Sequence, residues 1–131
     1  MIVDLEEKEE SGSFELKGGG KVHLRLMSRK DIKEIRDATT TVVSEYPLLD
    51  GKYQRFETEK VDVELLMEMR LDRNITRWDD LFDKNGNPIP VTKENKVLLM
   101  VMVPEFRTAV DDGLVALKKA EADRVEQVSK N

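Results

Sequence analysis

The residues best suited to chemistry gather in one acidic stretch, but their spacing does not match a metal site. Five oxygen-bearing side chains surround one glycine, as in a calcium-binding loop: Asp79, Asp80, Asp83, Asn85 and Asn87. If Gly86 took the sixth place of such a loop, Leu81 and Thr92 would take the first and twelfth, where carboxylates are required. We therefore expect a turn whose acids accept hydrogen bonds from backbone amides.

A catalytic constellation is not recognisable either. His23 is the one histidine, and a general base needs an orienting partner and a nearby nucleophile. It falls in an alternating segment, where we expect it to face outward from a strand. The carboxylates Asp62, Glu64 and Glu68 have no histidine or cysteine near them in the sequence. The glycines 18–20 lack the Lys-Ser or Lys-Thr ending of a phosphate loop. We expect no enzyme activity, no cofactor and no metal.

Length and charge favour one small domain behind an acidic arm. The chain has 131 residues, no cysteine and a net charge of −5. Residues 1–12 contain five acids and one lysine, and we expect a flexible arm there, followed by a single domain over 13–131. The remaining body is nearly neutral, which argues against a nucleic-acid partner. The start lacks a signal peptide and the apolar run 97–103 is too short to cross a membrane, so we expect a cytoplasmic protein.

The elements predicted first are a β-hairpin and two helices. Residues 13–17 and 21–26 alternate at the strand period around three glycines, with an inner face of Phe14, Leu16, Val22, Leu24 and Leu26. Ser28 and Asp31 form a capping box for a helix that we expect to continue to Tyr46, because apolar residues recur at helical spacing until Pro47. A second helix is expected over residues 58–73.

Two further helices complete an α+β fold that is mostly helical, with an N-terminal β-hairpin followed by about four helices in one small domain. Thr92 can cap a helix whose centre, residues 97–103, is apolar on every side. A buried strand has the same signature, but the polar residues 93–96 favour a helix. Pro104 suits the first turn of the last helix.

The segment from Trp78 to Asn95 combines a tryptophan, an Asn-Gly turn, two prolines and a helix cap. In this order it resembles the tail assembly chaperones of long-tailed bacteriophages and prophages. The resemblance covers about residues 13–120 and depends on these positions: Trp78, Asp83, Gly86, Asn87, Pro88, Pro90, Thr92, Glu94, Asn95, Leu98, Leu99, Pro104 and Phe106.

The resemblance implies a non-enzymatic chaperone that binds the tape measure protein, helps recruit tail tube subunits and leaves before the tail is complete. The alternative is a structural tail or head–tail connector component that stays in the virion. We expect no nucleic-acid or membrane partner. The apolar helix could also join copies of this chain, so a homo-oligomer is possible in either role.

The methionine-rich run predicts where a client would bind, because methionine adapts to varied apolar partners. The candidate surface is Leu98, Leu99, Met100, Met102 and Phe106. The same run could equally be core or a subunit interface. If it is client surface, Leu99→Asp with Met102→Asp should abolish binding and leave the fold intact. The structural anchor and turn are expected at Trp78, Gly86, Pro88, Pro90 and Thr92.

Overall fold

The computed structural model describes residues 1–2 and 9–130, with side chains as far as residue 127. The acids Asp4, Glu6 and Glu7 of the expected arm lie outside the described residues. The fold is α+β, as predicted, and its elements follow in this order: β1 (Ser11–Glu15), β2 (Lys21–Arg25), α1 (Arg29–Thr39), β3 (Thr40–Glu45), β4 (Leu48–Leu49), β5 (Lys52–Tyr53), β6 (Phe56–Val61), α2 (Val63–Asn74), β7 (Ile75–Asp79), α3 (Lys93–Met102) and α4 (Pro104–Lys130).

The predicted hairpin forms two strands of an antiparallel sheet with the order β1-β2-β7. Gly18, Gly19 and Gly20 all have positive φ, so the reversal between β1 and β2 needs residues without a Cβ. Strand β1 begins at Ser11, inside the expected flexible arm, and the Glu10 carboxylate accepts a hydrogen bond from Arg124 Nε at 2.7 Å. The prediction that residues 1–12 form a flexible segment was therefore wrong at the C-terminal end of that segment.

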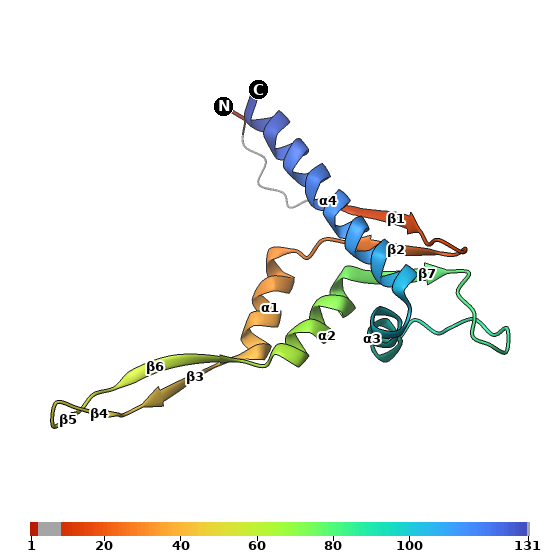
Figure 1. The fold of residues 1–131 in the computed structure, drawn as a ribbon. Helices are drawn as coiled ribbons and strands as arrows, with labels where there is room; N and C mark the ends of the chain where they lie inside the picture. The colour runs from red at the N-terminus through yellow and green to blue at the C-terminus, as the bar shows by residue number, and fades with distance from the viewer. Residues whose placement is uncertain (3–8, 131) are drawn as a thin grey trace.

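Helix α4 lies across one face of the sheet, in contact with β1 and β2 (Figure 1). Gly113 permits this close approach, because a Cβ there would lie 2.7 Å from side-chain atoms of both Leu24 and Phe14. The predicted inner face of the hairpin packs into the resulting core, with Phe14 and Leu26 partly buried at its margin. The buried members of this core are Leu16, Val22, Leu24, Ile75, Trp78, Leu99, Phe106, Ala109, Val110 and Leu117.

The carboxylate of Asp31 fastens α1 to both the sheet and α2. The predicted capping box is present, and one oxygen of Asp31 accepts from Ser28 N at 3.0 Å and Arg25 Nη1 at 2.8 Å. The other accepts from Arg73 Nη1 on α2 at 2.6 Å. The hydrogen bond from Arg25 is the largest cause that holds the pKa of Asp31 far below its usual range, in spite of its burial.

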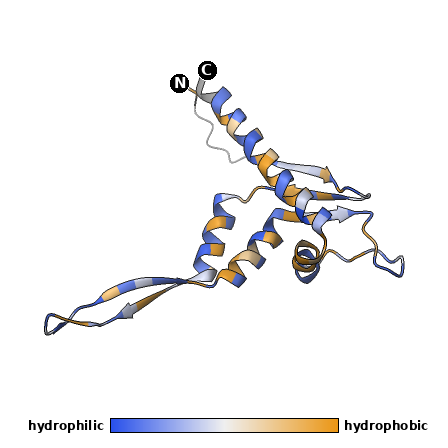
Figure 2. Ribbon diagram, viewed as in Figure 1, coloured by the Kyte–Doolittle hydropathy of each residue, from blue (hydrophilic) through white to orange (hydrophobic). Residues whose placement is uncertain are grey.

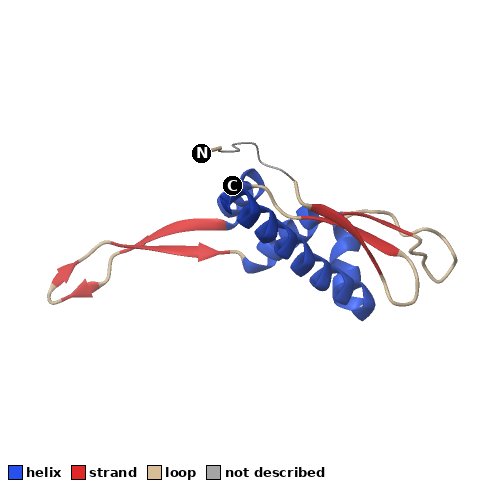
Figure 3. Cartoon of the chain, turned by 90° about the horizontal axis from the view of Figure 1, so that it is seen from above, coloured by secondary structure: helices blue, strands red, loops and turns tan. Residues whose placement is uncertain are grey.

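A long β-hairpin projects from the end of α1 and α2; we call residues 40–61 the arm. Strands β3 and β6 pair antiparallel from Thr40↔Val61 to Glu45↔Phe56, and β4 and β5 continue to the tip. Figure 3 shows the arm and the three-stranded sheet at opposite ends of the helical body. Every residue from 44 to 60 is exposed.

The arm corrects two helix predictions. The helix expected to reach Tyr46 ends at Thr39, and the helix expected from residue 58 begins at Val63, capped by Asp62. Residues 39–43 are all β-branched, and such side chains favour strands over helices. The apolar positions after Thr39 happened to continue a helical spacing, but their backbone pairs with a segment about fifteen residues away.

Strand β7 was not predicted. The sequence analysis predicted no strand after the helix expected to end at residue 73, but α2 runs directly into β7, and Ile75 is fully buried against β2. Asn74 stabilises this transition, because its side chain donates to Arg25 O at 2.9 Å. The two helices that follow match the sequence prediction, with Thr92 as the cap of α3 and Pro104 as the start of α4.

Candidate protein-interaction surface

Trp78 joins the sheet, the following loop and α4. Its side chain is 7% exposed, and its ring meets that of Phe106 edge to face, with centroids 5.8 Å apart. The indole Nε1 donates to Ile89 O at 2.9 Å, which ties the loop after β7 to the core. This arrangement is the anchor that the sequence predicted for Trp78: an apolar ring in the core with its one polar group satisfied.

The acidic loop is a braced turn. The Asp83 carboxylate accepts from the backbone amides of Asn85 and Asn87 at 2.9 and 3.0 Å, as the sequence predicted for these acids. Gly86 supplies the positive φ at the turn, and Pro88 lies in a β-bridge opposite Phe82.

The end of this loop sets the position of α3. Thr92 Oγ1 accepts from Asn95 N at 3.1 Å, and the Asn95 side chain donates to Pro90 O at 2.9 Å. The threonine cap and Pro90 therefore fix the first turn of α3 relative to the loop, so the turn residues act as a positioning device for that helix.

Helix α3 has a defined inner face despite its apolar sequence. Leu99 is 8% exposed within the core, and Lys96 is 7% exposed. The Lys96 ammonium donates to Asp72 O at 3.1 Å and to the Asp72 carboxylate at 3.0 Å, which locks α3 against α2. The face of α3 that carries Lys96 and Leu99 is therefore buried within the monomer.

The outer face of α3 is apolar and exposed. Leu98, Val101 and Met102 are 51%, 65% and 71% exposed and share one side of the helix by their spacing of three and four residues. Figure 2 shows hydrophobic residues on the ribbon of α3 together with the polar residues of its first turn. We call these three residues the α3 outer face. Val101 was missing from the predicted surface, although it belongs to the same apolar run.

Two predicted surface residues belong to the core. Phe106 is fully buried under Trp78, and Leu99 is buried on the inner side of α3, so neither contributes exposed apolar area. Met100 is partly buried and packs against the core. Leu99 is therefore not a surface residue, and an aspartate at position 99 would place a charge in an apolar core, so we expect Leu99→Asp to destabilise the fold.

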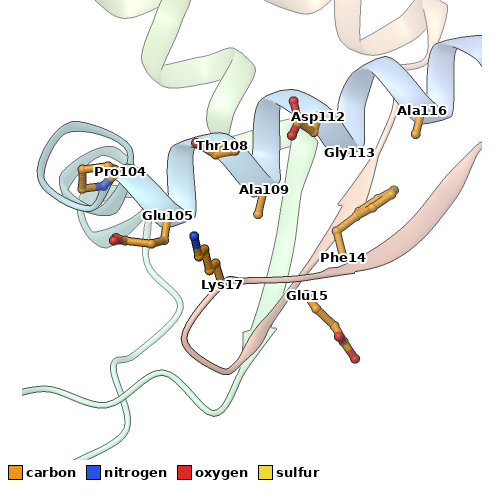
Figure 4. A pocket seen from close by; sticks show the side chains of 10 residues that line it. All are labelled: Phe14, Glu15, Lys17, Pro104, Glu105, Thr108, Ala109, Asp112, Gly113 and Ala116. Atoms are coloured by element: carbon orange, nitrogen blue, oxygen red, sulfur yellow. The ribbon is translucent and has the colours of Figure 1, made fainter.

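A shallow pocket of about 620 Å³ opens between β1 and α4, next to the corner where α3 ends (Figure 4). Its floor consists of small residues on successive turns of α4, Ala109, Gly113 and Ala116, and the Phe14 ring stands at one side. The acids Glu15, Glu105 and Asp112 and the base Lys17 line its polar margin.

The His23 side chain is hydrogen-bonded to Asp79 and does not simply face outward as predicted. Its Nε2 lies 2.7 Å from Asp79 Oδ2 across the β2–β7 pair, and its side chain is 21% exposed. The hydrogen bond with His23 is the first cause that lowers the pKa of Asp79, with a smaller contribution from Arg77, whose Nη1 lies 3.7 Å away. The contact between His23 and Asp79 connects β2 to β7, so both side chains have a structural role.

The described residues contain no group of three or more His, Cys, Asp or Glu side chains that could hold a metal ion. Within the same part of the chain, no helix combines the length and the apolar character that crossing a bilayer requires.

Comparisons with protein-family models, with curated proteins and with solved structures found no match to this chain.

A second apolar surface, at the tip of the arm, was missed by the sequence analysis. Five large side chains there are between 43% and 76% exposed: Tyr46, Leu48, Leu49, Tyr53 and Phe56. The available signal was Asp50-Gly51 between two apolar segments, since that dipeptide is typical of tight hairpin turns. Both residues have positive φ, as such a turn requires.

Proposed function

We propose that this protein is a non-enzymatic tail assembly chaperone of a bacteriophage or prophage. It would act in the cytoplasm of the bacterial host, bind the tape measure protein, help recruit tail tube subunits and be absent from the finished virion. The proposal begins from the resemblance of residues 78–106 to that family. The observation that carries it further is the α3 outer face, where three large apolar side chains are exposed on a helix fixed at both ends.

The α3 outer face has the physical properties that a holding chaperone needs. Lys96 and Leu99 keep the inner side of α3 attached to the body, so binding a client does not require the domain to unfold. The apolar outer side can cover the apolar stripe of a helical client, as in other helix-in-groove complexes. Three exposed side chains are a small contact, which suits a complex that must later dissociate.

The pocket beside the α3–α4 corner can extend this contact. Pro104 and Glu105 form its near end, directly after the last residue of the α3 outer face. A client helix that covers Met102 could continue over the small-residue floor of the pocket. The acidic margin would favour basic side chains on that client.

Co-expression with the tape measure protein tests the proposal. The wild-type chain should keep the tape measure protein soluble, and Leu98→Asp with Met102→Asp should abolish this effect while the circular dichroism spectrum stays unchanged. A matched control places the same charges on exposed valines of α4, Val115→Asp with Val125→Asp, which should retain the effect. The surface assignment is wrong if both double variants solubilise the client equally, and the function is wrong if the wild type does not.

The alternative role, a structural tail or head–tail connector component, is favoured by the projecting arm, because an exposed hairpin is suited to permanent contacts between subunits. Mass spectrometry of purified particles separates the two roles. A chaperone should be absent from the particles, whereas a structural component should be present in a fixed number of copies.

A further inference from the structure

Within the part of the chain that the structure describes, the arm lacks the packing that normally stabilises a hairpin of its size. Its main contact with the body is at the base, where β3 leaves α1 and Asp62 N donates to Thr39 O at 2.8 Å. A two-stranded hairpin alone in water is marginally stable, and usually needs a third strand or a packing partner. Figure 1 shows the arm extending well away from the helices. The missing packing partner must come from outside the monomer.

The apolar side chains of the arm gather at its outer half. Tyr46, Tyr53 and Phe56 are 59%, 76% and 44% exposed. At roughly 200 Å² for a whole aromatic side chain, these three expose about 350 Å². An apolar patch of that size on a monomer commonly marks an interaction site. Glu45 lies opposite Phe56 in the ladder, so a carboxylate accompanies the ring on the same face.

A groove at the base of the arm has the complementary character. It lies between α1, α2 and the first residues of the arm and has a volume of about 350 Å³. A cavity of about 150 Å³ holds a benzene ring, so the groove has room for an aromatic side chain and an aliphatic neighbour. Apolar residues dominate its lining: Met27, Ile32, Ile35, Val61 and Leu66.

Two arginines give the groove its charge. Arg36 and Arg70 line it, and no acidic residue does. Among the residues that the structure describes, neither guanidinium takes part in an ion pair or a side-chain hydrogen bond. The carboxylate of Glu45 is likewise unpaired within the described part of the chain. The cation near the Phe56 ring, Arg55, is paired with Glu57 at 2.8 Å. The face of the arm that carries Phe56 and Glu45 is therefore complementary in polarity and charge to the apolar groove with its arginines.

We propose that the tip of the arm in one copy of this chain docks into the α1–α2 groove of a second copy. The tip cannot fold back into its own groove, because six paired residues at about 3.3 Å each hold it about 20 Å from the base. Each copy carries one tip and one groove, so two copies can exchange arms reciprocally about a two-fold axis, or each copy can dock its tip into the next, head to tail. The reciprocal exchange gives a closed dimer, and the head-to-tail contact gives rings or open chains. This inference does not depend on the identity of any client.

Charge exchange tests the docking. Glu45→Arg puts a cation beside the tip, and Arg36→Glu with Arg70→Glu puts anions around the groove. Each variant alone should associate at least about tenfold more weakly than the wild type, because like charges meet at the contact. An equal mixture of the two should recover wild-type association, since each tip then meets a groove of opposite charge. Sedimentation velocity of the full chain measures this.

Three results would overturn the docking by this experiment: a wild type that stays monomeric at every concentration, charge variants that associate as the wild type does, or a mixture that remains dissociated while circular dichroism shows both variants folded. A monomeric wild type would leave the chaperone proposal standing, because that proposal is tested by client solubility alone.

The absence of cysteine allows a direct geometric check by disulfide trapping. Chains with Tyr53→Cys mixed with chains with Ile32→Cys should give cross-linked heterodimers, because the tip would lie against the groove. Tyr53→Cys mixed with Val115→Cys is the control, since Val115 is similarly exposed but lies on α4, and it should give none. If Tyr53→Cys chains link mainly to one another, the arms pair side by side and the docking is refuted. Equal linking to Ile32→Cys and Val115→Cys would also refute it.

Discussion

The Asp31 carboxylate offers a sharp test of how the helices are attached to the sheet. It is 8% exposed at its side chain, and it accepts hydrogen bonds from Arg25 and Arg73 and from the capped helix start at Ser28. A hydrogen bond to a charged group contributes about 1.5–3 kcal/mol. The arginine side chains are 21% and 32% exposed, so water can partly replace the lost partner. We expect Asp31→Asn to lower the free energy of unfolding by about 2–3 kcal/mol.

The pH dependence of this loss follows from the direction of the pKa shift. The folded pKa of Asp31 lies well below its usual range, so its ionised form stabilises the protein above the unfolded pKa of about 3.9. This contribution falls as the pH falls below that value, because the unfolded chain then binds a proton that the folded chain does not. Between pH 7 and pH 3 the advantage of wild type over Asp31→Asn should shrink by roughly 1 kcal/mol.

Urea unfolding of both chains at the two pH values measures these quantities. Asp37→Asn is the matched control, because Asp37 is an exposed acid on the same helix, and it should change stability by less than about 0.5 kcal/mol. The reasoning fails if Asp31→Asn costs no more than this control. It also fails if the deficit of Asp31→Asn is the same at pH 3 as at pH 7.

Two further substitutions test the packing. Trp78→Phe keeps an aromatic ring but removes the hydrogen bond to Ile89 O, so we expect a loss of about 1–2 kcal/mol in thermal unfolding and faster amide exchange in the loop after β7; unchanged exchange would contradict the anchor role. Gly113→Ala gains about 1 kcal/mol of helix propensity, yet its Cβ would meet Leu24 and Phe14 at 2.7 Å. We expect overpacking to exceed that gain and to lower stability by about 1–2 kcal/mol net, and a more stable variant would show that α4 can move away from the sheet.

Local signals in the sequence predicted much of the fold. The hairpin follows from alternating apolar residues around three glycines, and the starts of α1, α3 and α4 follow from Ser28, Thr92 and Pro104. Each of these signals depends on interactions between residues close in the sequence, so it predicts the local structure without knowledge of the tertiary contacts. The Trp78 anchor could also be predicted, because a lone indole in a core needs a nearby acceptor.

What the sequence did not predict depends on distant contacts. Whether residues 40–45 continue a helix or form a strand is decided by pairing with residues 56–61, and helical spacing in that segment was misleading. Distant contacts also decide which residues of the predicted client-binding surface are exposed and which are buried. A helix that is apolar all round does not indicate which side the body will cover, and only the placement of α2 and α4 assigns Leu99 to the core and Leu98 to the outside. Phe106 lies on α4, where its contact with Trp78 buries it.

The arm also has a geometric consequence for any assembly that uses it. Both of its strands continue directly from helices, so its root is fixed while its length is free to vary. Adding or deleting two residues in each strand preserves which side chains share a face and moves the far end by about 7 Å. In an assembly held by the proposed docking, the number of residues in the hairpin would therefore set the distance between neighbouring molecules, separately from the contacts that keep the domain folded.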